Sequence, residues 1–143
     1  MGFRALAVIV LLAGTAYAQS KSPWSEGVTD EPKAKAKVLL DAGKAKFVEH
    51  DYGAALEQYA AAVAVWDHPA IRFNMVRCLV QLGRNLEAAD SLDKALQYGP
   101  APLEAAIYDE AIGYQKLLAS QIATVTAVCD QPGVTVTLDG KPF

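Results

Sequence analysis

Residues 43–62, GKAKFVEHDYGAALEQYAAA, align with residues 76–95, VRCLVQLGRNLEAADSLDKA, at an offset of 33 residues. In this alignment Ala55 and Ala62 coincide with Ala88 and Ala95. A self-similar period of this length is typical of arrays of antiparallel helix pairs. One such pair cannot bury its apolar face alone, so stacked pairs share a core and expose an extended surface that usually binds other proteins. The pattern thus predicts a class of activity without identifying a ligand.

Five helices are predicted from apolar residues that recur every three or four positions. They cover residues 33–48, 52–66, 69–82, 85–97 and 102–123. The first four form two antiparallel pairs, and the fifth is expected to close the open end of the stack. The predicted fold class is therefore mostly α, an α-solenoid of helix pairs with a capping helix, and the helical domain is expected to span residues 33–123.

The side chains within these helices predict how the pairs pack. In the first helix the expected apolar face comprises Val38, Leu39, Ala42, Ala45 and Phe47. In each second helix, two alanines seven residues apart would let the paired backbones approach closely. Helix propensity alone is an alternative explanation for any single alanine. Recurrence at the same offset favours the packing interpretation.

The pattern changes from helix to strand after residue 123. Residues 124–129 and 134–138 alternate apolar and hydroxyl side chains, and Asp139-Gly140 is a strong turn pair. A two-stranded hairpin is only marginally stable in water, so a further strand would be expected. The sequence predicts the start of a truncated β module over residues 124–143.

The N-terminal 18 residues have the pattern of a secretion signal. Arg4 precedes an apolar run from Ala5 to Ala16, and Ala16-Tyr17-Ala18 matches the small-x-small cleavage site. The run is too short for the roughly 20 residues of a membrane-spanning helix, although an uncleaved anchor is the alternative. Export is expected, with no transmembrane anchor after cleavage. Residues 19–32 are polar and interrupted by prolines, so they are expected to be a flexible linker.

The composition excludes several function classes. Without Arg4 the exported chain would carry 12 basic and 16 acidic side chains, which argues against nucleic-acid binding. The two histidines, His50 and His68, fall at predicted turns without metal-ligand spacing, and the chain has no phosphate-binding loop. We expect no enzyme, no cofactor and no metal site. Cys78 and Cys129 could form a disulfide, but burial as small apolar side chains is the favoured alternative.

Two motifs resemble known families. The series Gly43-x3-Phe47-x4-Tyr52-x2-Ala55-Leu56-x2-Tyr59-x2-Ala62 and Leu82-Gly83-Arg84-x2-Glu87-Ala88-x6-Ala95-Leu96-x3-Pro100 resembles the tetratricopeptide repeat (TPR). It departs from that pattern at Val76, where the first unit has Gly43, and at His50, where the second unit has Gly83. Residues 132–141, PGVTVTLDGK, are similar to the opening of a PEGA domain. Together with a signal peptide, these resemblances imply a periplasmic or cell-envelope interaction protein of a Gram-negative bacterium.

Charge separates between the two helices of each pair. Residues 35–48 and 69–82 carry six basic side chains against Asp41, whereas the second helices are acidic. In TPR arrays the first helices line the concave surface, so the resemblance implies a groove that favours an acidic or C-terminal segment of a partner. The alternative is a solvated face with lysine stems lying on apolar surface. The candidate partner-binding residues are Lys37, Leu40, Lys44, Phe47, Phe73, Arg77 and Gln81.

The predicted function is that of an exported protein–protein interaction adaptor, or scaffold, of the bacterial cell envelope. It would bind an envelope protein or peptide segment through the concave face of the TPR-like helices. The alternative is a structural or cell-wall-associated element attached through the PEGA-like module over residues 124–143. In that case the helices would act only as a spacer.

Overall fold

The computed structural model describes residues 22–123 and, beyond them, positions 126, 128, 130, 135, 137–138 and 141–142. The expected secretion signal over residues 1–18 and the start of the expected linker lie outside the described residues. No helix within the described part of the chain is both long and apolar enough to cross a membrane.

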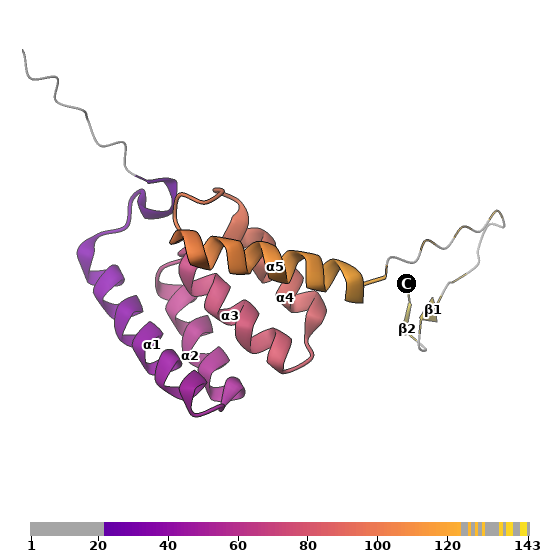
Figure 1. The fold of residues 1–143 in the computed structure, drawn as a ribbon, viewed down its shortest axis with the longest axis horizontal. Coiled ribbons are helices and arrows are strands. Elements are labelled where there is room, and N and C mark those ends of the chain that lie inside the picture. The colour runs from indigo at the N-terminus through magenta and orange to yellow at the C-terminus, as the bar shows by residue number, and fades with distance from the viewer. Residues whose placement is uncertain are drawn as a thin grey trace, which may run out of the picture.

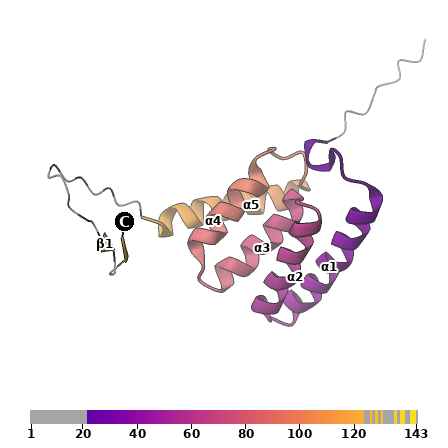
Figure 2. The same ribbon diagram turned by 180° about the vertical axis from the view of Figure 1, so that it is seen from behind.

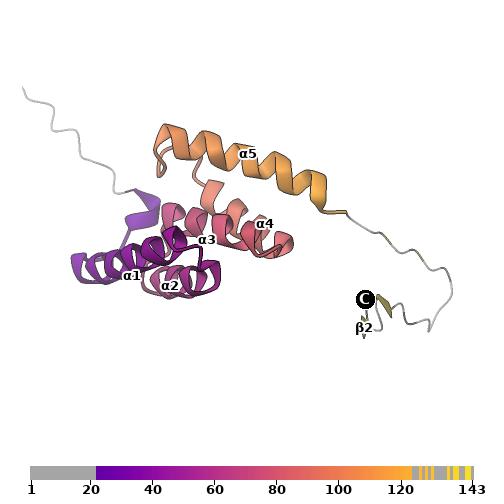
Figure 3. The same ribbon diagram turned by 60° about the horizontal axis from the view of Figure 1, so that its bottom comes forward.

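The described residues form a short 3-10 turn and five α-helices (Figure 1). Their bounds are η1 Pro23–Ser25, α1 Asp30–Val48, α2 Tyr52–Val65, α3 Pro69–Gln81, α4 Asn85–Leu96 and α5 Ala105–Gln121. Helices α1 and α2 form one antiparallel pair, α3 and α4 form the next, and α5 lies across α3 and α4 (Figures 1 and 3). Seen from behind, the helices of the two pairs follow one another in chain order (Figure 2). The prediction of a mostly helical, stacked fold is confirmed.

The predicted β module is not supported. Among the residues described beyond α5, only Thr137–Leu138 (β1) and Lys141–Pro142 (β2) pair, antiparallel and with two residues each. The predicted first strand spans residues 124–129, of which the structure describes Thr126 and Val128. Neither of these two residues is in a strand. The other residues of that strand lie outside the described part of the chain.

The four repeated alanines lie in the core. Ala55, Ala62, Ala88 and Ala95 are each 0% exposed, which confirms the packing interpretation. Because alanine has almost no side chain, α2 and α4 approach their neighbours closely at these points. Larger apolar side chains fill the space between these contacts, and the buried core runs without a break from α1 to α5.

A glycine sets the distance between α1 and α2. A Cβ atom built on Gly43 would lie only 2.6 Å from Cδ1 of Tyr59, inside the ring's van der Waals surface. Tyr59 is itself almost fully buried, so its ring cannot move aside. Burial also raises the pKa of the Tyr59 hydroxyl to about 12. Gly43 is therefore required here for close packing rather than for an unusual backbone conformation.

The two turns within the pairs have the same backbone form. His50 and Gly83 both have left-handed dihedral angles, with φ of 61° and 71°. This conformation costs a residue with a side chain roughly 1–2 kcal/mol, so the histidine departs from the repeat pattern at some energetic cost. Asp51 is the residue after His50, and its carboxylate accepts a 3.1 Å hydrogen bond from the Ala54 amide, which caps α2.

One expectation about α1 was wrong. Val38, Ala42 and Ala45 belong to the predicted apolar face, but all three are exposed, Val38 by 69%. Helix α1 is at the end of the stack and packs chiefly on α2, so one side of it is buried, at Ala36 and Gly43. Apolar periodicity alone did not distinguish this side from the outer one.

Residues 22–29, expected to be linker, contact both helix pairs, and α1 starts at Asp30. The Trp24 carbonyl accepts a 2.8 Å hydrogen bond from Nε1 of Trp66, at the end of α2. The Trp24 ring also packs against Tyr98, after α4, with centroids 5.6 Å apart. A tryptophan buries enough apolar area to hold an otherwise polar segment against the fold.

Candidate functional site

A groove of 420 Å³ lies between the N-terminal halves of α1 and α3. Its walls come from three places: the first turns of α1, the turn between α2 and α3, and the start of α3. The residues that line it are Lys33, Ala34, Lys37, Leu40, Trp66, His68, Ala70 and Ile71. Two residues of the predicted partner-binding set, Lys37 and Leu40, are among them.

Local sequence explains the wall between α2 and α3. Trp66 follows the last residue of α2, and its backbone conformation is extended. His68 then caps α3, because its Nδ1 accepts a 3.1 Å hydrogen bond from the Ala70 amide. Pro69 occupies the first position of α3, where its fixed φ suits helix initiation. The rings of Trp66 and His68 meet edge to face with centroids 4.5 Å apart, which makes one wall of the groove aromatic.

Two polar atoms of this aromatic wall already have partners. Nε1 of Trp66 donates to the Trp24 carbonyl, and Nδ1 of His68 is used in the helix cap. Burial lowers the pKa of His68, an effect that Asp67 partly offsets, so the ring is neutral at pH 7. A ligand in the groove therefore meets mainly apolar surface on this side.

The charges of the groove come from α1. Nζ of Lys33 lies 5.9 Å from the centroid of the Trp66 ring and 4.0 Å from Asp30. Lys37 is 73% exposed and binds Asp41 at 2.5 Å, while Lys44 approaches the same carboxylate at 3.8 Å. The hydrogen bond from Lys37 is the main cause that lowers the pKa of Asp41. Asp41 is shared between two lysines, and it does not itself line the groove.

Helix α5 covers the part of the predicted binding face that Phe73 and Arg77 of α3 form. Phe73 was predicted to contact a partner, but it is 1% exposed and packs edge to face on Tyr114 of α5, at 5.9 Å between centroids. Arg77 forms a two-point ion pair with Glu110 of α5, and its guanidinium lies over the Phe73 ring. Phe73 is thus a core residue and Arg77 is largely neutralised. The predicted contact role of Phe73 is wrong, because the sequence pattern does not show where α5 lies.

The remaining candidates lie away from the groove. Lys44 is exposed on α1, and Gln81 is exposed at the last residue of α3. Phe47 is half-buried and packs on Tyr52, with centroids 5.3 Å apart. None of the three lines the 420 Å³ groove. Of the seven candidates, only Lys37 and Leu40 are brought together at it.

Sequence reasoning missed six residues of the groove, namely Lys33, Ala34, Trp66, His68, Ala70 and Ile71. Trp66 was placed at the end of the predicted second helix, and His68 was assigned only to a turn. The spacing of Lys33 and Lys37 was an available signal, because residues four apart lie on the same face of a helix.

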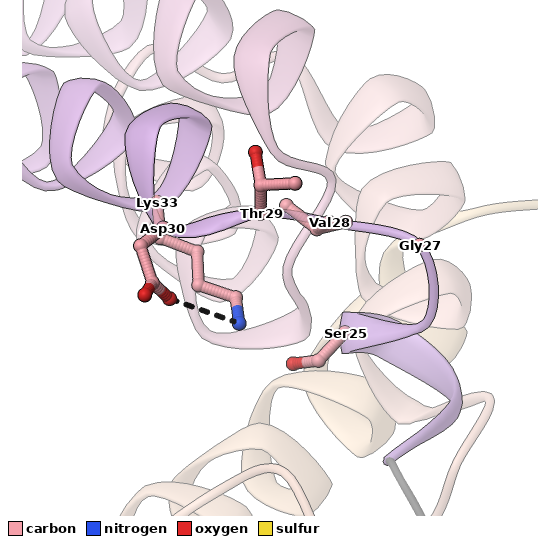
Figure 4. A pocket seen from close by; sticks show the side chains of 6 residues that line it. All are labelled: Ser25, Gly27, Val28, Thr29, Asp30 and Lys33. Carbon is pink, nitrogen blue, oxygen red and sulfur yellow. Dashed lines mark ion pairs between the residues drawn. The ribbon is translucent and has the colours of Figure 1, made fainter.

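A second hollow of 500 Å³ adjoins the first at Lys33 (Figure 4). It is lined by one continuous stretch of chain, Ser25 and residues 27–30, together with Lys33. Figure 4 shows the Lys33 and Asp30 side chains turned toward each other along its edge. A hollow formed by a single surface turn brings no distant groups together, so we assign it no binding role.

The described residues hold no cluster of three or more His, Cys, Asp or Glu side chains able to bind a metal ion. Cys78 is fully buried in α3, and burial raises the pKa of its thiol to about 11. At neutral pH it is a protonated, inert thiol. Cys129 lies outside the described residues, so a disulfide between the two cysteines, which the sequence does not favour, is not tested.

The histidine cap predicts a pH effect on stability. The folded state lowers the pKa of His68, so the unfolded chain binds more protons just below the ordinary value of 6.5. Stability is therefore complete above about pH 6.5 and falls as the pH drops toward the folded pKa. We expect the His68→Asn variant, which keeps a capping oxygen but does not titrate, to lose part of this dependence. Thermal unfolding between pH 7 and pH 5 measures it.

The control for this prediction is His50→Asn. His50 is exposed and has a left-handed backbone that asparagine tolerates well. That variant keeps the His68 cap, so its stability should still fall as the pH drops from 7 to 5. Equal pH dependence in the parent and in His68→Asn would contradict the prediction.

The groove suits binding rather than covalent chemistry. It is open and apolar and has two lysines at its edge, and in its wall Nε1 of Trp66 and Nδ1 of His68 already have hydrogen-bond partners. Pockets of this size usually bind through apolar contacts with a few placed polar groups. Comparison of this chain with models of protein families, with curated proteins and with solved structures gave no match.

Proposed function

We propose that this chain is an exported adaptor, or scaffold, of the bacterial cell envelope that binds another protein through the face formed by α1 and α3. The observation that carries the proposal is the open groove at the N-terminal halves of these helices, with its aromatic wall and lysine edge. The resemblance to TPR proteins and the predicted secretion signal add the expected location and the expected mode of binding.

The stacked architecture supports the same function. Helix pairs that share one core form a rigid support, which keeps the groove open without a ligand. A preformed site loses less conformational entropy on binding than one that must first become ordered. The groove also avoids the part of the face that α5 covers, so the binding surface is smaller than the sequence pattern predicted.

The experiment is photo-crosslinking in intact cells that produce the protein. A photo-reactive amino acid is placed at position 37 beside the groove or, as a control, at position 94 on α4. Lys37 and Lys94 are matched, because each is exposed and pairs with an aspartate one turn away. We expect one discrete envelope protein to be captured from position 37 and not from position 94, as identified by mass spectrometry.

Two results would contradict this proposal. Capture of only wall material or of the protein itself would favour the structural role through residues 124–143. The structural role would also be favoured if deletion of residues 124–143 released the protein from the envelope and crosslinking at position 37 captured no discrete partner. Partner capture that survives the deletion supports the adaptor function.

A further inference from the structure

The open part of the binding face has a particular chemistry. Beyond the first turn of α3, α5 covers Phe73 and pairs with Arg77. A ligand is left with the part of the face at the start of α3, where the groove lies between Leu40, Trp66 and Ile71. Of the predicted contact residues, Lys37 and Leu40 line this groove, whereas Lys44 and Arg77 do not.

The floor and wall of this groove select an apolar group. Leu40, Ala70 and Ile71 have aliphatic side chains, and the indole donor of Trp66 is already bonded to Trp24. A polar side chain placed here would lose its hydrogen bonds to water and gain few in return. The volume of 420 Å³ holds one bulky side chain together with a short piece of its backbone.

The edge of the groove selects negative charge. Its eight lining residues include two lysines and no carboxylate, and His68 is neutral at pH 7. Lys33 and Lys37 are one helical turn apart on the same side of α1. Lys33 and Lys37 pair with Asp30 and Asp41, but these are solvent-exposed pairs within one helix, which are worth little, and their carboxylates lie outside the groove lining. A carboxylate of the ligand can therefore compete for both lysines. The charge at the edge is therefore complementary to an acidic ligand, although the protein as a whole is acidic.

We propose that the ligand is an acidic protein segment that inserts one bulky aliphatic or aromatic side chain between Leu40, Trp66 and Ile71. Its carboxylates pair with Lys33 and Lys37. This inference rests on the proposed adaptor function and specifies the partner of that site. The apolar contact supplies most of the binding, and the two lysines supply selectivity for acidic flanks and a faster, salt-dependent association.

The test is selection of displayed 12-residue random peptides on the exported chain, residues 19–143, followed by sequencing. We expect enrichment of Leu, Phe or Trp flanked by Asp or Glu. An enriched peptide is then synthesised, and its affinity is followed through tryptophan fluorescence. The double variant Lys33→Glu with Lys37→Glu should weaken binding at least tenfold, and Leu40→Ser should weaken it similarly. Lys94→Glu, the matched charge reversal on α4, should change affinity less than twofold.

Far-UV circular dichroism confirms that each variant is folded, and higher salt should weaken binding of the parent more than that of the charge-reversed variant. Enrichment of basic or wholly polar peptides overturns the inference, as does binding that Leu40→Ser leaves unchanged. No enrichment at all also overturns it. These outcomes concern the ligand alone, because crosslinking at position 37 tests separately whether the face has an envelope partner.

Discussion

Replacement of Gly43 by alanine is expected to destabilise the protein by about 1–3 kcal/mol, although alanine is the better helix former. The added Cβ would overlap the ring of Tyr59, which is buried between α1 and α2 and cannot turn away. Relief requires the two helices to separate, which disturbs the packing along the pair. For a helical domain of about this size, each kcal/mol lowers the melting temperature by roughly 4–8 °C. Thermal unfolding followed by circular dichroism measures the change.

Gly113→Ala is the matched control. Gly113 is exposed within α5, and an added Cβ would meet nothing within 4 Å. Here only backbone entropy and helix propensity change, so stability should rise by about 0.5–1 kcal/mol. The two substitutions are chemically identical, and both are made inside a helix. A rise in melting temperature for both variants would show that Gly43 and Tyr59 are not in contact.

Replacement of Phe73 by alanine is expected to cost about 3–5 kcal/mol, because it leaves a cavity in the core. The ring is 1% exposed and touches Tyr114 and the Arg77 guanidinium, so its loss also removes the support for α5. Since small domains have roughly 5–15 kcal/mol of stability in total, this is a large fraction. Urea unfolding gives the free energy change.

The comparison variant is Lys44→Ala, which removes an exposed side chain from the same predicted binding face. Its effect on stability should stay within about 0.5 kcal/mol. Both residues belonged to the set expected to bind a partner. If Phe73→Ala were as stable as Lys44→Ala, α5 would not lie over α3, and Phe73 would again be a candidate contact residue.

Much of the helical architecture could be predicted from residue order. Apolar periodicity, the two left-handed turns and Pro69 are local signals, and they placed the ends of most helices within a few residues. The β module was less predictable. Alternation over residues 124–138 is compatible with a strand, but a strand also needs a partner, and the described residues contain only the two-residue pairing of β1 and β2.

The candidate site was predicted in part. Lys37 and Leu40 were found because they lie on the first helix of a pair, which the TPR resemblance assigns to the concave face. Trp66 and His68 were not, because Trp66 ends the predicted second helix and His68 lies in the turn after it, and periodicity does not show what these two side chains face. Their position depends on the contact with Trp24, which is 42 residues away from Trp66 in the chain.

Residue order was thus sufficient to establish five helices, their pairing and the small residues at their contacts, since these follow from interactions between near neighbours in the chain. The open part of the binding face depended on how α5 packs, because only the folded chain brings Glu110 to Arg77 and Tyr114 to Phe73. Periodicity indicates that a helix has an apolar side but not which neighbour covers that side, and in α1 three of the five residues that it grouped are exposed. The exposure of Val38, the burial of Phe73 and the position of the groove are therefore properties of the packed structure.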